Sequence, residues 1–416
     1  MKVFKFGGAS VSTIERIQNV ACILKKYEGD QLLVVISAMG KTTNALEKVA
    51  ESFFEGNSHE ALELFVKIRK EHIQLSKDLE LEISGLNDFF TEIEWLLHDK
   101  PVRNYDYYYD QIVSAGELLS SFIISNYLAS AGLPNMWIDV RDIIRTDNNF
   151  RNAEINWEVT KSAVDNRIQP LFKNLSIAIT QGFIGATDEN ESTTLGREGS
   201  DYTAAVFANL LDAESQTIWK DVKGVMNADP KQYSKAEWIR ELSFKEVIEM
   251  AYYGAQVIHP KTIKPLQNKN IPLHVKSFIN HDEEGTMIHS KNSQNLPSII
   301  VYKNNQVLVQ FTSKDFSFVN EGLTADLFVM FENLRFKPNL TQNAAISLLC
   351  VVDDHVNKID QLAHAAAQLF DVQITRGLTL LTIRHFNVDI IKELVHDKTV
   401  ILQQQTTETI QVLMNN

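Results

Sequence analysis

The chain has 416 residues, of which 44% are hydrophobic and 22% are charged, a composition typical of a globular protein of two or three domains. Its formal net charge of −13 argues against nucleic acid or an anionic membrane as a partner. We find no apolar signal region and no apolar run of membrane length, so we expect a cytoplasmic protein. Cys22 and Cys350 stand among apolar residues and are predicted to be buried free thiols.

The chain begins with a strand and a glycine turn that suit a phosphate. Alternating apolar side chains predict the strand, and Gly7 and Gly8 follow it directly. The glycines allow a tight turn that brings backbone N–H groups close to an anion, and Lys5 adds a full charge beside it. Ser10 or Ser12 is expected to cap the next helix. Taken alone, this short motif fits an ordinary strand-turn-helix connection better than a phosphate site.

Strand candidates alternate with helical segments through the first two thirds of the chain. Strands are expected at residues 32–36, 135–139, 176–180 and 217–219, and helices at residues 117–131, 202–211 and 244–253. This alternation predicts a three-layer α/β fold with a mainly parallel central sheet. Residues 57–100 are wholly helical in pattern and predict a helical insertion beside the sheet.

The pattern changes after a polar linker at residues 289–298. Strands and helices now alternate in short segments, at residues 307–311, 323–334, 347–352, 359–370, 379–383, 388–395, 399–402 and 410–413. They predict two small α+β units of βαββ type. We therefore expect a first domain of residues 1–290, then a region of residues 298–416 with units at about 298–375 and 376–416.

A second segment that can carry chemistry covers residues 196–205. Arg197 offers a planar fork suited to a carboxylate or a phosphate. Ser200 or Asp201 is expected to cap the helix that follows, which leaves backbone N–H groups free for an anion. A capped helix with a surface arginine explains the segment equally well.

Two acidic residues stand at positions where ligands can bind. Asp221 follows a strand and precedes a loop with glycine and Asp-Pro, which is where open α/β sheets bind nucleotides. An ordinary turn is the simpler explanation of that loop. Glu117 is expected at the start of a helix, where it could orient an amine, although a solvated glutamate that stabilises the helix dipole is the default.

Two other motifs are more plausibly structural. Gly-Lys-Thr at residues 40–42 is similar to the end of a Walker A loop, but Val35 occupies the position of its first glycine, which disfavours a P-loop NTPase. A polar loop that lines a substrate site is the better interpretation. His259 stands between apolar residues and a proline and is predicted to be a hydrogen-bonded structural histidine.

In this order the segments resemble the aspartate kinases of the amino-acid-kinase superfamily. Residues 5–11, KFGGASV, are similar to the family's K-F-G-G-[TS]-S-V, and residues 35–39 to its V-[VL]-S-A-M. Residues 196–205 resemble G-R-G-G-S-D-Y-T-A, and residues 219–230 resemble W-T-D-V-x-G-[IV]-x-x-x-D-P. The resemblance covers the whole chain, and the ordered series is far more specific than any single motif.

The resemblance implies an amino-acid-kinase fold followed by paired ACT-like regulatory units. It implies MgATP-dependent phosphorylation of the L-aspartate side chain to 4-phospho-L-aspartate, the first step toward lysine, threonine and methionine. The cofactors would be ATP and Mg²⁺, and no residues are assigned to a protein metal site. The family further implies a homodimer and an amino-acid effector, lysine or threonine, near residues 322–325.

Roles follow by matching residues to the family pattern. Lys5 would neutralise the transferred phosphoryl group, and Asp201 would organise the reacting end of the substrate. The residues that would hold L-aspartate are Ser37, Thr43, Glu117, Arg197 and Ser200, with Glu117 facing the ammonium and Arg197 a carboxylate. The residues on the ATP side would be Lys5, Gly7, Gly8, Ser10, Lys220, Asp221, Met226, Lys231 and Gln256.

Some positions depart from the family pattern. Glu198 stands in place of a glycine, Lys220 in place of a threonine, and Gln256 in place of a lysine that contacts nucleotide. We hypothesise that Lys220 supplies the charge that Gln256 lacks. The departures leave a second interpretation open, a catalytically weak amino-acid-binding sensor on the same fold. Retention of Lys5, Arg197 and Asp201 favours the kinase, because a sensor has no need of a phosphoryl clamp.

Overall fold

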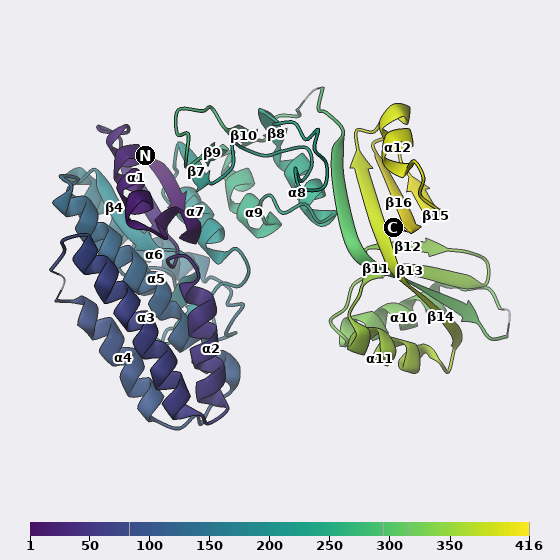
Figure 1. The fold of residues 1–416 in the computed structure, drawn as a ribbon, viewed down its shortest axis with the longest axis horizontal. Helices are drawn as coiled ribbons and strands as arrows, with labels where there is room; N and C mark the ends of the chain where they lie inside the picture. Colours follow the sequence, from purple (N-terminus) through teal and green to yellow (C-terminus); the bar gives the residue numbers. More distant parts are fainter. Residues whose placement is uncertain (83, 294, 316, 416) are drawn as a thin grey trace. The chain divides into compact units, whose positions relative to one another are not determined.

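The computed structural model describes residues 1–82, 84–293, 295–315 and 317–415, which form two compact units (Figure 1). The first unit contains Met1–Val225, Trp238–Ile248 and Val257–Ser293. The second contains Met226–Glu237, Glu249–Gln256 and the described chain from residue 295 onward. The predicted division into residues 1–290 and 298–416 remains a prediction.

An eight-stranded, mainly parallel sheet organises the first unit, as predicted. The strand order is β3-β4-β2-β1-β7-β9-β10-β8, and neighbouring strands from β3 to β9 are parallel, whereas β10 is antiparallel to β9. The strands are β1 (Lys2–Phe6), β2 (Leu32–Ile36), β3 (Asn135–Ile138), β4 (Ile177–Gln181), β7 (Ser215–Lys220), β8 (Glu241–Ser243), β9 (Leu273–Ser277) and β10 (Thr286–His289). All five residues of β2 are buried, as expected for a strand covered on both faces.

Helices cover the sheet, and a short antiparallel hairpin lies beside it. The helices are α1 (Ile14–Lys25), α2 (Thr42–Phe54), α3 (Ser58–Asp78), α4 (Leu86–His98), α5 (Tyr105–Ser130), α6 (Trp157–Ala163), α7 (Gly199–Leu210), α8 (Phe244–Tyr252) and α9 (Pro260–Lys269). The residues of α8 from Glu249 onward belong to the second unit. The hairpin consists of β5 (Ile184–Ala186) and β6 (Ser192–Thr194). The helices α3 and α4 lie in residues 57–100, the segment predicted to be wholly helical.

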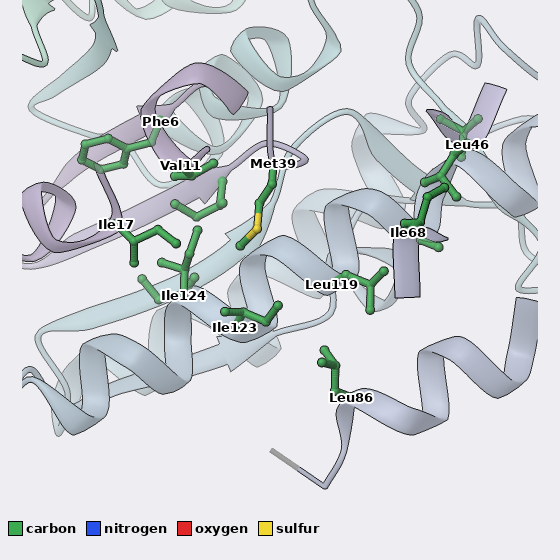
Figure 2. Close-up of a cluster of buried hydrophobic side chains, with 14 of the residues drawn as sticks. Phe6, Val11, Ile17, Met39, Leu46, Ile68, Leu86, Leu119, Ile123 and Ile124 are labelled. Carbon is green, nitrogen blue, oxygen red and sulfur yellow. The ribbon is translucent and has the colours of Figure 1, made fainter. Parts of the chain in front are cut away.

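One face of the sheet packs against α1 and α5 in a continuous apolar core. Figure 2 shows side chains of this cluster from β1, α1, α3 and α5. They are, in that order, Phe6, Ile17, Ile68 and Leu119. Since side chains alternate along a strand, Lys5 points to the opposite face. The helix α7 packs against that face of β1, and this arrangement places the start of α7 above Lys5.

The helix α5 is longer than predicted. It begins at Tyr105, where the Asn104 side chain accepts a hydrogen bond from the Tyr107 N–H. The prediction that Glu117 stands in the first turn of a helix is therefore wrong, because Glu117 lies in the buried interior of α5. The expectation of no membrane-length apolar run also fails for α5. However, 78% of the most apolar 18-residue stretch of this helix is buried inside the protein. Packing in the core therefore accounts for its apolar composition.

The helix α1 is capped by a different residue from those predicted. Residues Gly8–Val11 form a separate 3₁₀ turn, which leaves Ser10 and Ser12 upstream of the helix. Thr13 caps α1, and its side chain accepts a hydrogen bond from the Arg16 N–H. The glycine turn thus leads into a 3₁₀ turn and not directly into an α-helix.

The start of α7 also differs from the prediction. Ser200 and Asp201 belong to its first turn and do not cap it. Glu198 occupies the cap position with φ of 54°, in the left-handed region, and its side chain makes no capping hydrogen bond. The helix begins earlier than predicted because Gly199 is small enough to enter it beside Phe183: an added Cβ would lie 2.7 Å from the Phe183 ring.

The two cysteines have different environments. Cys350 is buried, as predicted, and burial raises the pKa of its thiol to about 12. Cys22 is exposed, which corrects the expectation that both are buried. Its apolar neighbours Ala21 and Ile23 are buried together with Ile17, Val20 and Leu24. Cys22 lies on the opposite side of the helix from this buried face, so buried neighbours in sequence do not make it buried.

A single six-stranded sheet organises the second unit. Its strand order is β12-β13-β11-β14-β16-β15, and all pairs are antiparallel. The elements are β11 (Ile299–Ser313), α10 (Glu321–Asn333), β12 (Leu340–Asn343), β13 (Ser347–Asp353), α11 (Val356–Ala366), β14 (Phe370–Arg384), α12 (Val388–Val395), β15 (Val400–Gln405) and β16 (Thr409–Asn415). This α+β arrangement fits the expected ACT-like class.

The long strands β11 and β14 join the two halves of this unit. They pair from Ile299 opposite Arg384 to Ser313 opposite Phe370, so the predicted border near residue 375 falls within β14. The helices α10 and α11 pack on one half, and α12 packs on the other. A helix was predicted to end at Phe370, but Phe370 instead begins β14. The strand β12 was not predicted. Position 294 of the expected linker lies outside the described residues.

Candidate active site

A cavity of about 450 Å³ opens beyond the carboxyl ends of β1 and β2. These strands are parallel and adjacent, so the loops that follow them meet at one edge of the sheet. The predicted site residues that line the cavity are Lys5, Gly8, Ser37, Thr43, Glu117, Arg197, Ser200 and Asp201.

The glycine turn packs tightly against the loop after β2. An added Cβ on Gly8 would lie 2.5 Å from the Ala38 carbonyl oxygen, so only glycine fits there. The Gly40 N–H donates to the Gly8 carbonyl oxygen at 3.0 Å. At Gly7 the nearest atom to an added Cβ would be Lys5 Nζ, at 3.5 Å. The turn is therefore held close to the second loop while Gly7 leaves space beside the Lys5 ammonium.

Lys5 and Asp201 form the central ion pair of the cavity. Lys5 Nζ lies 2.7 Å from Asp201 Oδ1, and the side chains are only 12% and 5% exposed. Burial by itself raises the pKa of Asp201, but the charges of Lys5 and Lys220 and the contact with Lys5 outweigh it and lower that pKa. The carboxylate thus stays ionised in a largely dry site.

Glu117 presents a second carboxyl group to the cavity in the opposite protonation state. Its side chain is buried, and burial raises its pKa to about 8, although the charge of Lys5 and the Ala38 N–H oppose the shift. Among the described residues, Glu117 Oε2 has no hydrogen-bond partner. A buried acceptor without a partner is costly, and a cationic ligand such as an ammonium group would satisfy it.

The other predicted substrate residues surround these carboxyl groups. Ser37 follows β2, and its N–H donates to the Phe6 carbonyl oxygen at 3.1 Å. Thr43 lies in the first turn of α2, and Ser200 in the first turn of α7. Arg197 is exposed, and we find no ion pair for it in the described part of the chain. Its guanidinium is therefore available to an anion.

Besides Lys5 and Gly8, which line the cavity, the predicted nucleotide residues fall into two groups. Gly7, Ser10, Lys220 and Asp221 belong to the first unit, but they are not among the residues that line the cavity. Met226, Lys231 and Gln256 belong to the second unit, and their role remains a prediction.

Lys220 and Asp221 both have partners within the first unit. Lys220 Nζ donates to the Val257 carbonyl oxygen at 2.9 Å. Arg16 donates from Nη1 to both carboxylate oxygens of Asp221, each at 2.9 Å, and to the Ala9 carbonyl oxygen at 3.0 Å. Arg16 thereby connects the end of β7 to the glycine turn.

Glu198, which replaces a family glycine, is engaged in a hydrogen bond. Its Oε2 accepts from the backbone N–H of His259 at 2.8 Å. His259 caps α9, where its Nδ1 accepts from the Lys261 N–H at 3.1 Å, in agreement with its interpretation as a structural histidine. The extra carboxylate of Glu198 thus links two helix starts.

Sequence reasoning missed one wall of the cavity. This wall includes Glu47, Tyr109, Arg151 and Thr194. The Tyr109 hydroxyl donates to Glu47 Oε1 at 2.6 Å. The tyrosine-rich run at residues 105–109 was the available signal, but its meaning depends on α5 extending over it.

The residues present are compatible with a magnesium ion that arrives with a nucleotide. Across the described chain, no group of three or more His, Cys, Asp or Glu side chains could hold a metal. Mg²⁺ commonly binds through one or two carboxylates together with substrate phosphates. Asp201 offers one such oxygen ligand at the cavity.

Comparison with known proteins identifies relatives along the chain. The amino acid kinase family profile matches residues 1–277. Aspartokinase 1, chloroplastic, of Arabidopsis thaliana is 33% identical over 366 residues, 84% of this chain. The chain spans 63% of the length of that relative. Lysine-sensitive aspartokinase 3 of Escherichia coli (strain K12) is 32% identical over 84% of this chain and 78% of its own.

Solved structures of Escherichia coli aspartokinase III share the fold. The complex with aspartate and ADP (R-state) has a TM-score of 0.83 at 26% identity and covers 100% of this chain and 96% of that chain. The complex with lysine and aspartate (T-state) has a TM-score of 0.79 at 26% identity and covers 99% and 95%. The chain therefore belongs to the amino acid kinase family, and within it to the aspartokinases.

Proposed function

We propose that this protein is an aspartate kinase that transfers the γ-phosphoryl group of MgATP to the side-chain carboxylate of L-aspartate. The observation that carries the proposal is the cavity in which the Lys5–Asp201 ion pair, Glu117 and Arg197 meet. The related aspartokinase III structure is a complex with aspartate and ADP. The product would be 4-phospho-L-aspartate.

The cavity offers groups complementary to each charge of L-aspartate. Glu117 would hold the ammonium group, which would supply the missing partner of its buried Oε2. Arg197 would bind a carboxylate, since a guanidinium matches a carboxylate with two parallel hydrogen bonds. Ser37, Thr43 and Ser200 would contribute hydrogen bonds around the substrate.

The transfer needs positioning and charge neutralisation more than a strong base. An oxygen of the ionised side-chain carboxylate attacks the γ-phosphorus, the bond to the β–γ bridging oxygen breaks, and ADP leaves with that electron pair. No proton has to be removed from the nucleophile. Lys5 would neutralise the phosphoryl oxygens, and the N–H groups of Gly7 and Gly8 would donate to them.

The nucleotide and its metal would lie beside this pair. Mg²⁺ supplies charge neutralisation on the phosphates when bound, and Asp201 is the residue that would help to hold it. The residues proposed on the nucleotide side are Ser10, Lys220, Asp221, Met226, Lys231 and Gln256.

Two of the relatives described above also suggest how the protein is regulated. We expect a cytoplasmic homodimer in which the C-terminal region binds an amino acid, and lysine is the first candidate. The T-state aspartokinase III structure contains lysine, and the 32% identical relative is lysine-sensitive.

The proposal is tested by measuring ADP release from purified protein with MgATP and either L-aspartate or L-glutamate. Hydroxylamine is added to trap an acyl phosphate as its hydroxamate. Hydroxamate that forms with L-aspartate and not with L-glutamate is the expected result. Binding of an amino acid without turnover of any would favour the sensor instead.

A further inference from the structure

Arg151 is a cavity residue that the roles above do not use. It lines the same wall as Tyr109 and Thr194. Its φ is 67°, in the left-handed region that favours glycine. A long side chain is kept in such a conformation only where the surroundings impose it, and such positions cluster at functional sites.

The backbone of Arg151 is held by a buried carboxylate. Its N–H donates to Asp110 Oδ2 at 2.9 Å, and the Asp110 side chain is fully buried. The same carboxylate accepts from the Thr194 N–H at 2.8 Å and from Thr194 Oγ1 at 2.7 Å. The loop is also packed against Gly196, where an added Cβ would lie 2.8 Å from Asn152 Oδ1. The position of Arg151 is therefore built into the wall.

Aromatic rings direct the side chain of Arg151. Its guanidinium carbon lies 4.4 Å from the ring centroid of Tyr109 and 5.5 Å from that of Tyr105. Its carboxylate contact is Asp106 Oδ1, at 3.1 Å, and the two side chains are 46% and 52% exposed. An exposed pair of this kind contributes little. The guanidinium is thus oriented by the rings yet retains donors for another anion.

The charges around the cavity leave one substrate group for the arginines. Glu47 already accepts from Tyr109, and Glu198 from the His259 N–H. As proposed above, Glu117 would hold the ammonium group, and the reacting carboxylate attacks the phosphoryl group that Lys5 would neutralise. The α-carboxylate of the amino acid remains, and the cations left to receive it are Arg197, which is exposed, and Arg151.

We propose that Arg151 is a specificity-determining residue that binds the α-carboxylate of the substrate together with Arg197. The inference rests on the proposed function, because it takes an α-amino acid as the occupant of the cavity. Two guanidinium groups would give the site a strong preference for an ionised α-carboxylate over a neutral group of the same shape.

The test compares L-aspartate with L-aspartic acid 1-amide, in which the α-carboxylate is a neutral carboxamide. The variant Arg151→Gly removes the side chain and suits the left-handed backbone, and Arg151→Asn is a second variant that tolerates it. We expect kcat/KM for L-aspartate to fall by about 10- to 100-fold, as for loss of a charge-assisted hydrogen bond. The value for the 1-amide should change far less, and the KM for ATP should not change.

Asp106→Asn is the matched control, because it removes the exposed partner of Arg151 and leaves the guanidinium in place. Its kcat/KM for L-aspartate should equal or exceed that of the wild type. Equal losses for both substrates in the Arg151 variants, or no loss for either, would overturn the inference.

A failure of the proposed function gives a different result. If the wild type turns over neither substrate, calorimetric titration of both compounds into wild type and Arg151→Gly replaces the kinetic comparison. A wild-type preference for L-aspartate that disappears in the variant supports the inference even then. An equal preference in both proteins contradicts it.

Discussion

Asp201 is ionised in a position where burial alone would raise its pKa. The charges of Lys5 and Lys220 overcome the cost of burial and lower its pKa. A lowered folded-state pKa stabilises the protein above the unfolded pKa of the carboxyl group, and this contribution is lost as the pH falls through the folded value. The ion pair that would act on the phosphoryl group is therefore also a structural element of the first unit.

Removal of Lys5 should separate these two roles. Lys5→Met strands a buried carboxylate and is expected to lower the free energy of unfolding by about 3 kcal/mol. The double variant Lys5→Met/Asp201→Asn should recover most of that stability in urea denaturation, because neither charge remains. Both variants should lose about 10²- to 10³-fold in kcat, since the electrostatic stabilisation is absent.

Lys41 provides the matched control for Lys5. It lies at the start of α2 and lines a different cavity, of about 610 Å³. Lys41→Met should leave kcat close to the wild-type value. A larger loss at Lys41 than at Lys5 would favour the P-loop alternative.

Glu117 should give the reaction a pH dependence. Because its pKa is raised to about 8, it is protonated near neutral pH and must ionise to hold an ammonium group. We expect kcat/KM for L-aspartate to rise with pH through about 8, and Glu117→Gln should remove that rise.

The free energy of unfolding should change with pH in the opposite direction to kcat/KM. The folded state holds the Glu117 proton more tightly than the unfolded chain. The free energy of unfolding should therefore fall as the pH rises from 4.5, the ordinary pKa of a glutamate, to about 8, the raised pKa of Glu117. Glu117→Gln should flatten this dependence in denaturation curves. Glu55→Gln, at an exposed glutamate, should leave it unchanged.

At the scale of elements, the site depends on how closely two loops approach. The turn after β1 contacts the loop after β2 through Gly8. The start of α7 lines the same cavity as these two loops and brings Asp201 to Lys5. None of these elements holds a complete site by itself. The parallel order of β1, β2 and β7 brings them together.

The two glycines of the turn should respond differently to substitution. Gly8→Ala places a methyl group 2.5 Å from the Ala38 carbonyl oxygen, so it should cost about 1–3 kcal/mol in stability, as overpacking does. Gly7→Ala has space and an ordinary φ of −76°, so it should fold with nearly wild-type stability. Its methyl group stands beside Lys5, and we expect it to raise the KM for ATP. Equal melting temperatures for both variants would contradict this account.

At the scale of the whole molecule, the chain contains two compact units with separate cores. Each has its own sheet, and their buried clusters do not share strands. Units of this kind commonly unfold in more than one step.

Calorimetry of the full chain should therefore show more than one transition. L-Aspartate should raise the midpoint of the transition of the first unit, whose residues line the cavity, because a ligand stabilises the unit that binds it. Lysine should raise the midpoint of the other, and L-glutamate serves as the control for a non-specific effect. One cooperative transition, shifted equally by every ligand, would show that the units unfold together.

Local pattern was sufficient for much of the architecture. The continuous apolar run of β2, the helical period of α3 and the limits of α12 are all readable along the chain, because each depends on neighbours within a few turns. The glycine turn, Lys5 and the segment around Arg197 were equally visible. Their family pattern indicated residues that line the cavity.

Tertiary structure decided what depends on residues far apart in sequence. Glu117 looks like a surface residue near a helix start, and only its burial within α5 raises its pKa. β11 and β14 become long strands because they pair with each other over their whole length. Arg151 enters the cavity because Asp110, a distant residue, holds its backbone in a conformation that its own sequence does not favour. The sequence thus determined elements and motifs through local periodicity, whereas burial and long-range pairing determined protonation, strand length and the second arginine of the site.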